Sequence, residues 1–366
     1  MRYTAKQGFR HDDQPRLGVL VANLGTPDAP DTPSLRRYLA QFLGDPRVIE
    51  LPRILWRAIL HGIVLRTRPK KSAASYREVW TEEGSPLLAT GKGQVEGIQR
   101  FLDQRLRGPV DVRLGMRYGN PSIPDRLREL RDAGAERIVI LPLFPQYSGT
   151  TTASAFDALA DEFKQWRWIP EFRMIGQYHD DARYIRCLAQ SIREHWSNNG
   201  RGERLLFSFH GTPKRYLLNG DPYHCQCRKT ARLVAEELEL NDDDWQVVFQ
   251  SRFGNEEWLK PYTDETVTEL AQHGYKTLDV ICPGFSADCL ETLEEIEEEN
   301  REYFEEAGGE ALRYVRCLND RRDHLEFLAE LIMEHAQGWP EAGGPPRGLR
   351  DPAATRERAH ALGSEV

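Results

Sequence analysis

The amino-acid sequence predicts an α/β protein made of two similar halves, each with a parallel sheet flanked by helices. Two observations lead to this prediction. Short apolar runs alternate with longer amphipathic segments of helical period, which is the pattern of βαβ units. The chain also resembles itself, because two pairs of segments recur in the same order in its first and second halves.

The expected strands are short, near-continuous apolar runs, which suit strands that are covered on both faces. The first is LGVLVANLG, Leu17–Gly25. The others are Val110–Leu114, Arg137–Leu143, Arg204–Phe209, Gln246–Gln250 and Thr277–Cys282. Helical periodicity predicts a helix from about Thr32 and helices over Gly93–Arg105, Ser122–Ala133, Ser154–Trp166, Ala182–Trp196, Cys227–Glu239, Asp264–His273 and Asp288–Phe304.

Each half opens on a strand that ends in Gly-Thr-Pro. VLVANLGTP (Val19–Pro27) matches LLFSFHGTP (Leu205–Pro213). Further along, the strand and Pro-containing turn within residues 133–156 match those within residues 273–293. Ligands bind beyond the carboxyl ends of the strands in such sheets, so we expect all four turns to face a cleft between the halves.

We expect the two halves, as domains, at residues 17–175 and 176–337, joined around Pro170–Asp181. The polar residues 1–16 are expected to be flexible. The tail, residues 338–366, is rich in Pro, Gly, Ala and charge and lacks periodicity, which predicts disorder.

The composition of the chain argues against several classes of protein. Of 366 residues, 40% are apolar and 29% charged, as in soluble globular proteins. The net charge of −8 argues against a nucleic-acid partner. No run approaches the roughly 20 apolar residues of a membrane-spanning helix. The N-terminus lacks the apolar run of a secretory signal, so we expect a cytoplasmic protein whose six cysteines remain thiols.

Several familiar motifs are absent from the sequence. There is no G-x-G-x-x-G or G-x-x-x-x-G-K-[ST] motif for a nucleotide, and no G-x-S-x-G elbow. The cysteines do not follow an iron–sulfur spacing, which argues against a [2Fe–2S] cluster.

His210 ends an apolar strand directly before a Gly-Thr-Pro turn, which would hold its imidazole at the mouth of the cleft. Imidazole binds borderline divalent metals and exchanges protons near neutral pH. A histidine that only makes structural hydrogen bonds is the alternative interpretation of this position.

An acidic helix is expected in FSADCLETLEEIEEENREYF. Leu290, Leu293, Ile296 and Phe304 share one face, whereas Glu291, Glu295 and Glu299 follow one another at i, i+4 and i+8 on the other. Stacked carboxylates need either water or cations. The acidic face is also typical of an ordinary solvated helix, and Asp288-x-x-Glu291 fits a capping box that would make Glu291 structural.

Position distinguishes these alternatives. Glu291 opens the helix after the second Pro turn, and His210 follows the first strand of the same half, so both should point into one cleft. An imidazole and a carboxylate are a reasonable pair for Fe²⁺. Aromatic and polar residues of other expected cleft loops would suit a flat apolar ligand with acidic substituents. These are Tyr76, Met116-Arg117-Tyr118, Gln146-Tyr147-Ser148 and Trp258.

Five segments resemble the ferrochelatase family in the right order, and the resemblance runs from about Leu17 to His335. They are GVLVANLGTPDAP, LPLFPQYSGTTTASAF, LLFSFHGTPKRYLLNGDPYHCQC, FQSRFGNEEWLKPYTDE and CPGFSADCLETLEEIEEEN. The closest likeness is to the Gram-negative bacterial form. The resemblance implies the class II chelatase fold, with two Rossmann-like domains, and insertion of Fe²⁺ into a porphyrin held between them to give protohaem.

Residue by residue, the resemblance implies that His210 and Glu291 are the metal and proton-transfer pair, and that Glu295 and Glu299 form a relay. It places the porphyrin against Leu24, Tyr76, Arg117, Tyr118, Ser148, Trp258 and Asp288. It also implies that residues 51–71, an apolar helix followed by Arg66, Arg68, Lys70 and Lys71, form a lip that can rest on the inner membrane. An ordinary packed helix would look the same.

Departures from the family pattern concern the substrate. Position 24 is Leu, where members acting on coproporphyrin typically carry Tyr, so protoporphyrin IX is the expected porphyrin. Cys289 stands where animal members have His. The family implies no prosthetic group, because Fe²⁺ is a substrate. A chelatase for coproporphyrin III or another metal, and a non-catalytic haem or metal carrier, remain as alternatives.

Overall fold

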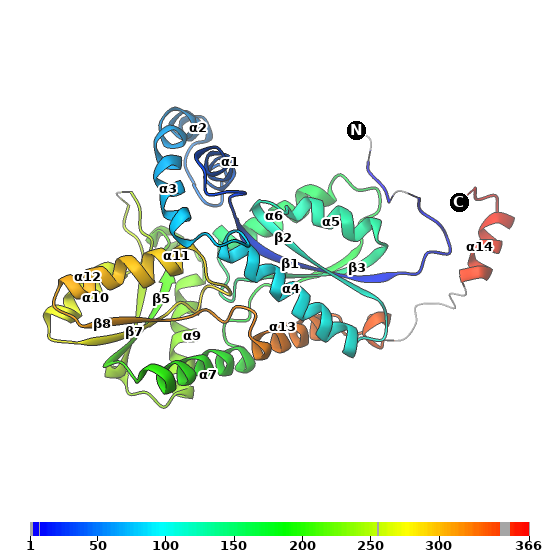
Figure 1. Cartoon of the computed structure of the whole chain (residues 1–366). Helices are drawn as coiled ribbons and strands as arrows, with labels where there is room; N and C mark the ends of the chain where they lie inside the picture. Colours follow the sequence, from blue (N-terminus) through cyan, green and yellow to red (C-terminus); the bar gives the residue numbers. More distant parts are fainter. Residues whose placement is uncertain (1–2, 7, 255, 345–351, 366) are drawn as a thin grey trace.

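The computed structural model describes residues 3–6, 8–254, 256–344 and 352–365 (Figure 1). These residues form two four-stranded parallel sheets with the same strand order, β2-β1-β3-β4 and β6-β5-β7-β8. The two Gly-Thr-Pro strands, β1 and β5, hold equivalent positions, and so do β3 and β7. The predicted duplicated α/β fold is therefore confirmed.

The strands are β1 Arg16–Thr26, β2 Val110–Gly119, β3 Ala135–Pro142, β4 Glu171–Met174, β5 Arg204–His210, β6 Trp245–Gln250, β7 Thr277–Ile281 and β8 Ala311–Val315. The helices of the first half are α1 Thr32–Phe42, α2 Arg53–Ile59, α3 Leu65–Val79, α4 Pro86–Arg105, α5 Ile123–Asp132 and α6 Ser154–Phe163. Those after it are α7 Ala182–Asn199, α8 Lys214–Leu218, α9 Tyr223–Glu237, α10 Thr263–Gln272, α11 Leu290–Thr292, α12 Arg301–Glu306, α13 Arg322–His335 and α14 Pro352–Ala361. π-helical turns occur at η1 Leu60–Val64, η2 Gly149–Ala153 and η4 Leu293–Asn300, and 3₁₀ turns at η3 Asp242–Asp244 and η5 Pro340–Ala342.

The central strands β1 and β5 are buried on both faces, which explains why they are almost continuously apolar. In β1, Val19 and Val21 enter one core cluster while Leu20 and Ala22 enter another, because successive side chains point to opposite faces. The first of these clusters also contains residues of β5, β6, α7 and α9 from the second half. One apolar core therefore runs through both halves.

Helix α13 joins the halves although it follows the last strand of the second sheet. It packs against α4, and its Phe327 and Leu328 share a core with Val19 of β1. Figure 1 shows α13 beneath the first half, close to α4. The expected second domain, 176–337, thus ends in a helix that packs on the first.

The segment after α13 corrects the prediction of a disordered tail. Within residues 338–344, Trp339 is fully buried and the Glu341 carboxylate pairs with Arg137 at 2.8 Å. Trp339 and Glu341 close the open end of the core, an interaction that composition alone does not reveal. Residues 352–361 form α14, whereas 345–351 and 366 lie outside the described residues.

The N-terminal segment is also attached to the first half where the structure describes it. The amide of Thr4 donates to the carbonyl of Gln165, and the amide of Arg167 donates to the carbonyl of Thr4, both at 2.8 Å. Residues 1–2 and 7, which belong to the expected flexible segment, lie outside the described residues.

Helices α1 to α3 form a separate layer above the carboxyl end of the first sheet (Figure 1). Trp56 anchors α2, because its buried indole donates to the carbonyl of Leu43 at 2.6 Å. Ile54 and Leu55 on the outer side of α2 are 89% and 57% exposed. The helix therefore packs on one side and presents an apolar surface on the other. Across the described chain, no helix is both long enough and apolar enough to span a membrane.

Candidate functional site

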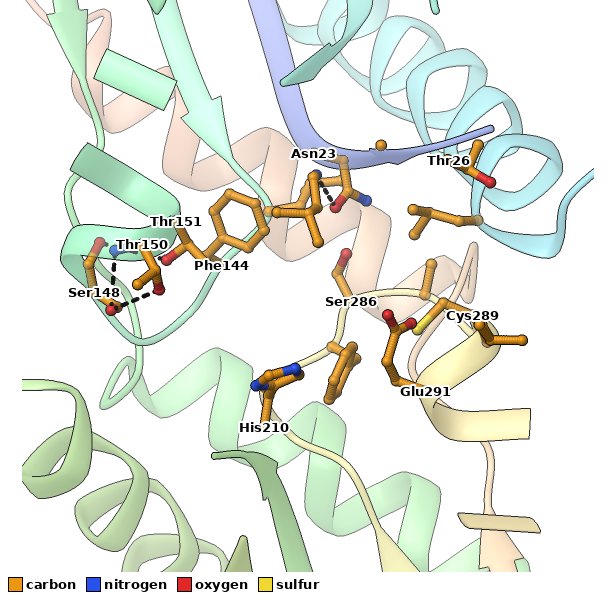
Figure 2. A pocket seen from close by; sticks show the side chains of 18 of the residues that line it. Asn23, Thr26, Phe144, Ser148, Thr150, Thr151, His210, Ser286, Cys289 and Glu291 are labelled. Atoms are coloured by element: carbon orange, nitrogen blue, oxygen red, sulfur yellow. Dashed lines mark hydrogen bonds between the residues drawn. The ribbon is translucent and has the colours of Figure 1, made fainter. Parts of the chain in front are cut away.

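A pocket with an empty volume of about 910 Å³ lies between the two halves, at the carboxyl ends of β1, β3, β5 and β7. This is the position predicted from the duplicated turns. Its wall contains aliphatic, aromatic and hydroxyl side chains from both halves. Figure 2 shows His210 and Glu291 pointing into it, His210 from the end of β5 and Glu291 from the short helix α11.

The His210 ring is oriented by its own turn. Its Nδ1 lies 2.7 Å from the carbonyl oxygen of Gly211, which can only accept, so Nδ1 carries the proton and Nε2 keeps a free lone pair. A side chain at Gly211 would meet the Gln250 carbonyl oxygen at 2.8 Å, so this position requires glycine. Tyr223 donates to the His210 carbonyl at 3.0 Å. The ring is thus fixed with a metal-binding or proton-accepting atom available.

Glu291 is not a capping residue. The helix begins at Leu290 with Cys289 as its N-cap, and Thr292 closes the turn by accepting from the Cys289 amide at 3.0 Å. Burial, and then the charge of Glu291, raise the pKa of the Cys289 thiol, which keeps it protonated beside that carboxylate. Glu291 is therefore not needed to cap the helix, and it lines the pocket.

Asp288 has a structural position instead. Its carboxylate accepts from the Tyr314 hydroxyl at 2.7 Å, the Cys317 amide at 3.1 Å and the Asn319 side chain at 2.9 Å. It does not line the pocket, contrary to the expected porphyrin contact. These contacts with the segment after β8 hold the loop that carries Cys289 and Glu291.

The expected ladder of carboxylates is split by the π-helical turn η4. Hydrogen bonds from i to i+5 widen the helix, so residues four apart do not repeat as they do on an α-helix. Glu295 turns toward the protein and accepts from Gln250 and Ser251. Burial raises its pKa to about 7. Glu299 is exposed and accepts from Tyr303 at 2.8 Å.

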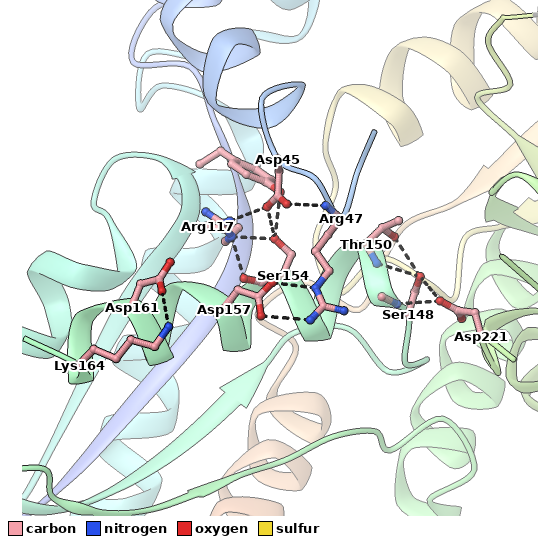
Figure 3. Close-up of polar contacts among 12 residues, drawn as sticks. Asp45, Arg47, Arg117, Ser148, Thr150, Ser154, Asp157, Asp161, Lys164 and Asp221 are labelled. Atoms are coloured by element: carbon pink, nitrogen blue, oxygen red, sulfur yellow. Dashed lines mark hydrogen bonds and ion pairs between the residues drawn. The ribbon is translucent and has the colours of Figure 1, made fainter. Parts of the chain in front are cut away.

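Leu24, Tyr76 and Ser148 line the pocket as expected. Burial raises the pKa of Tyr76 well above its usual value, and the charge of Glu291 contributes, so its hydroxyl remains protonated. Ser148 and the Gly149 amide donate to the Asp221 carboxylate at 3.1 and 2.7 Å, a link between the halves (Figure 3). Leu24, Tyr76 and Ser148 all come from the first half, opposite His210.

Arg117 and Tyr118 are not brought to the pocket, and neither is Trp258. Figure 3 shows Arg117 directed at the Asp45 carboxylate and at Ser154, and the Tyr118 hydroxyl also donates to Asp45, at 2.8 Å. The Trp258 ring is buried 6.5 Å from the centre of the His210 ring. These three residues therefore support the site and do not line the pocket.

Other lining residues were not predicted. Phe144 and Phe285 supply aromatic rings, and Pro86 and Leu87 open α4 at the pocket. Phe144 and Phe285 lie in the two duplicated Pro turns, so the repeat contained the information that locates them. In the described residues, no three His, Cys, Asp or Glu side chains converge as ligands for a metal ion.

Comparisons with known proteins agree with this geometry. A family model described as Ferrochelatase matches residues 16–336. A relative named ferrochelatase from Thioalkalivibrio sulfidiphilus is 56% identical over 364 residues, 99% of this chain and 99% of the relative. Another from Nitrosococcus oceani is 54% identical over 368 residues, covering both chains fully. Both are Gram-negative bacteria, as the resemblance implied.

Among solved structures, SirB from Bacillus subtilis with Fe³⁺ aligns with a TM-score of 0.51 at 12% identity, covering 88% of this chain and 96% of that chain. At this identity the likeness shows the fold alone, and it agrees with the class II chelatase fold predicted from the sequence. The family match and the full-length relatives show more: this chain belongs to the ferrochelatase family.

Proposed function

We propose that this protein inserts Fe²⁺ into a porphyrin bound in the pocket between its halves, with His210 and Glu291 as the metal and proton pair. The observation that carries the proposal is that a histidine, held by its Nδ1 on the Gly211 carbonyl, and a carboxylate face one pocket in a member of this family. Iron is then a substrate, and no prosthetic group takes part.

The macrocycle would lie between the Leu24 wall of the first half and the His210 wall of the second. Phe144 and Phe285 offer faces to a flat apolar ring. A rigid pocket can use binding energy to tilt pyrrole nitrogens out of the ring plane, which exposes their lone pairs. Fe²⁺ would exchange water for His210 and Glu291 and then pass to the ring.

Insertion releases two pyrrole protons for each Fe²⁺ bound. His210 Nε2 would accept one of these protons once iron has left that atom for the ring, because the same lone pair would serve as metal ligand and as base. Glu295 lies behind Glu291, and its pKa of about 7 lets it gain and lose a proton at neutral pH. Exposed Glu299 would complete the relay to water.

We assign protoporphyrin IX as the porphyrin, since Leu24 places a hydrocarbon side chain at the position where the resemblance implies a tyrosine in members that act on coproporphyrin. The product would be protohaem. Coproporphyrin III bears additional carboxylates, for which Leu24 offers no hydrogen-bond donor.

The outer side of α2 supports peripheral contact with the inner membrane. Ile54, Leu55 and Ile63 are exposed, and Arg53 and Arg57 lie beside them, an arrangement that attracts anionic lipid. The six cysteines are free thiols, in keeping with a reducing cytoplasm.

The test is anaerobic incubation of the protein with Fe²⁺, or with Zn²⁺, and either protoporphyrin IX or coproporphyrin III, followed by absorbance. We expect metallation of protoporphyrin IX. The variant His210→Ala should lose at least about a hundredfold in rate while it still binds porphyrin, because a general base contributes that much.

The control is His273→Ala, which removes an exposed histidine at the end of α10 and should leave the rate unchanged. Porphyrin binding without metallation by the unaltered protein would indicate a carrier. Preferred metallation of coproporphyrin III would overturn the substrate assignment. Full activity of His210→Ala would overturn the assignment of the site.

A further inference from the structure

Gln250 occupies the junction between the strand that carries His210 and the helix that carries Glu291. It is the last residue of β6, pairs in register with His210, and accepts the Gly211 amide on its carbonyl at 2.8 Å. Gln250 is buried, with only 3% of the residue exposed. Its amide Nε2 donates to the Glu291 carbonyl at 2.7 Å and to the Glu295 carboxylate at 3.3 Å.

The orientation of the Gln250 amide is fixed from the other side. Its Oε1 accepts from the Ser208 hydroxyl at 2.8 Å and from the Cys282 thiol at 3.6 Å. Ser208 lies in β5 and Cys282 directly follows β7. Because both neighbours donate, the Nε2 group must point at the acidic helix.

Ser251 supplies two further hydrogen-bond donors, and it does so from a strained backbone conformation. Its φ of 65° lies in the left-handed region, which serine rarely adopts. In this conformation the Ser251 amide donates to Glu295 Oε1 at 2.6 Å and its hydroxyl to Oε2 at 2.5 Å. Strained residues of this kind are often found where a site requires them.

We propose that Gln250 and Ser251 are positioning residues that form a cradle for the Glu295 carboxylate and fix the acidic helix relative to His210. The proposal rests on the proposed function, which it deepens. The cradle favours the ionised form of Glu295, since its three donors bond to the charged carboxylate.

Other groups around Glu295 are already engaged or face elsewhere. On the same helix as Glu295, the charge of Glu291 raises the pKa of Glu295. The protonated Cys282 thiol faces Glu295 from the end of β7. From α3, Ser75 and Glu78 act on Glu294. From α10, Asp264 and Glu265 pair with Arg252. After β8, Arg316 pairs with Glu297.

The test compares Ser251→Ala and Ser251→Gly in the full chain. Both remove the hydroxyl donor, so Glu295 should hold its proton to higher pH. In the pH profile of the insertion rate, the rise in rate should occur at a pH about one unit higher. Activity should be about tenfold lower below neutral pH and little changed in alkali. Infrared titration of the Glu295 carboxyl band, identified by its loss in Glu295→Gln, should show the same shift.

Glu239→Gly is the matched control, because Glu239 also has a positive φ, of 57°, but is exposed at the end of α9. It should relieve backbone strain and leave the pH profile unchanged. Ser251→Gly should be more stable to urea than Ser251→Ala, yet share its pH shift, which separates strain from hydrogen bonding.

An unshifted pH profile and carboxyl band in both Ser251 variants, with active unaltered protein, would overturn the cradle and leave the proposed function intact. An equal shift in Glu239→Gly would also overturn it. Failure of the unaltered protein to insert metal would instead overturn the proposed function.

Discussion

Asp45 shows how a single carboxylate supports the pocket without touching it. It accepts from Arg117, Tyr118, Ser154 and the Arg47 amide, and its side chain is only 2% exposed. Burial by itself would raise the pKa of Asp45, but hydrogen bonds from Ser154, Arg47 and Tyr118 and the charge of Arg117 lower it overall. Asp45 thus ties the segment before the lip to β2 and α6, together with the ion pair between Arg47 and Asp157.

We predict that Asp45→Asn lowers the free energy of unfolding by about 3 kcal/mol at neutral pH, because Arg117 loses its buried partner. The folded-state pKa lies below the unfolded one, so this stabilisation is present above about pH 4 and is lost as pH falls through the folded value. Urea unfolding of both proteins at several pH values measures the difference. Asp161→Asn is the control, since the exposed Asp161–Lys164 pair in Figure 3 contributes little. An undiminished difference in acid would contradict the prediction.

His210 and Glu291 could be predicted from sequence because His210 directly precedes one duplicated turn and Glu291 follows another, and the carboxyl ends of parallel strands converge. Asp45 could not, since its partners Arg117, Tyr118 and Ser154 are 72, 73 and 109 residues away. The family resemblance implied that Arg117 and Tyr118 contact the porphyrin, and the sequence does not show that Asp45 faces them. Residue type identifies a polar group at a strand end, whereas only the fold shows which charge faces it.

At the scale of elements, long apolar runs were predicted well and short elements were missed. Strand β4, EFRM, is exposed over half its length and has no apolar run. Strand β8 has only five residues. Helix α13 was also missed, although its buried Leu325, Leu328 and Ile332 recur at helical spacing. The π-helical η4 could not be derived from an α-helical wheel, which explains why Glu295 and Glu299 diverge.

The second prediction concerns α2. Replacing both Ile54 and Leu55 by Glu should weaken binding to anionic phospholipid vesicles by about tenfold or more, because each side chain loses roughly 2 kcal/mol of apolar burial. Co-sedimentation measures it, and insertion into detergent-dispersed porphyrin should be unaffected. Leu218→Glu provides the control, as Leu218 in α8 is 74% exposed and lies outside the lip. Equal losses in both variants would remove the lip from membrane binding.

At the scale of the whole molecule, the last packed residues return to the first half. Trp339 donates to Glu171 at 2.8 Å and lies under Arg173, whose guanidinium is 4.3 Å from the ring centre. The Glu341 carbonyl accepts from the amides of Arg107 and Gly108. From α13, the shared core and these contacts, we predict that the two sheets unfold together.

The third prediction follows from these contacts. A chain that ends at Gln337 should lose at least about 3 kcal/mol of unfolding free energy relative to one that ends at Gly344, because a fully buried tryptophan is removed. Both should unfold in a single urea transition, monitored by circular dichroism and by tryptophan fluorescence. Two separate transitions in the chain that ends at Gly344 would show that the halves fold independently.

The equivalent places of β1 and β5 have a consequence for the sidedness of the reaction. Where Gly-Thr-Pro follows His210 in one half, it follows Leu24 in the other, and both side chains line the pocket. A planar ring between two identical walls would present equivalent faces to equivalent ligands. Here the second half supplies His210 and Glu291, whereas the first half supplies Leu24 with neutral polar side chains, so only one wall offers the imidazole and carboxylate pair to iron. Because the two copies have diverged, the two walls of the cleft present different side chains to the two faces of the ring.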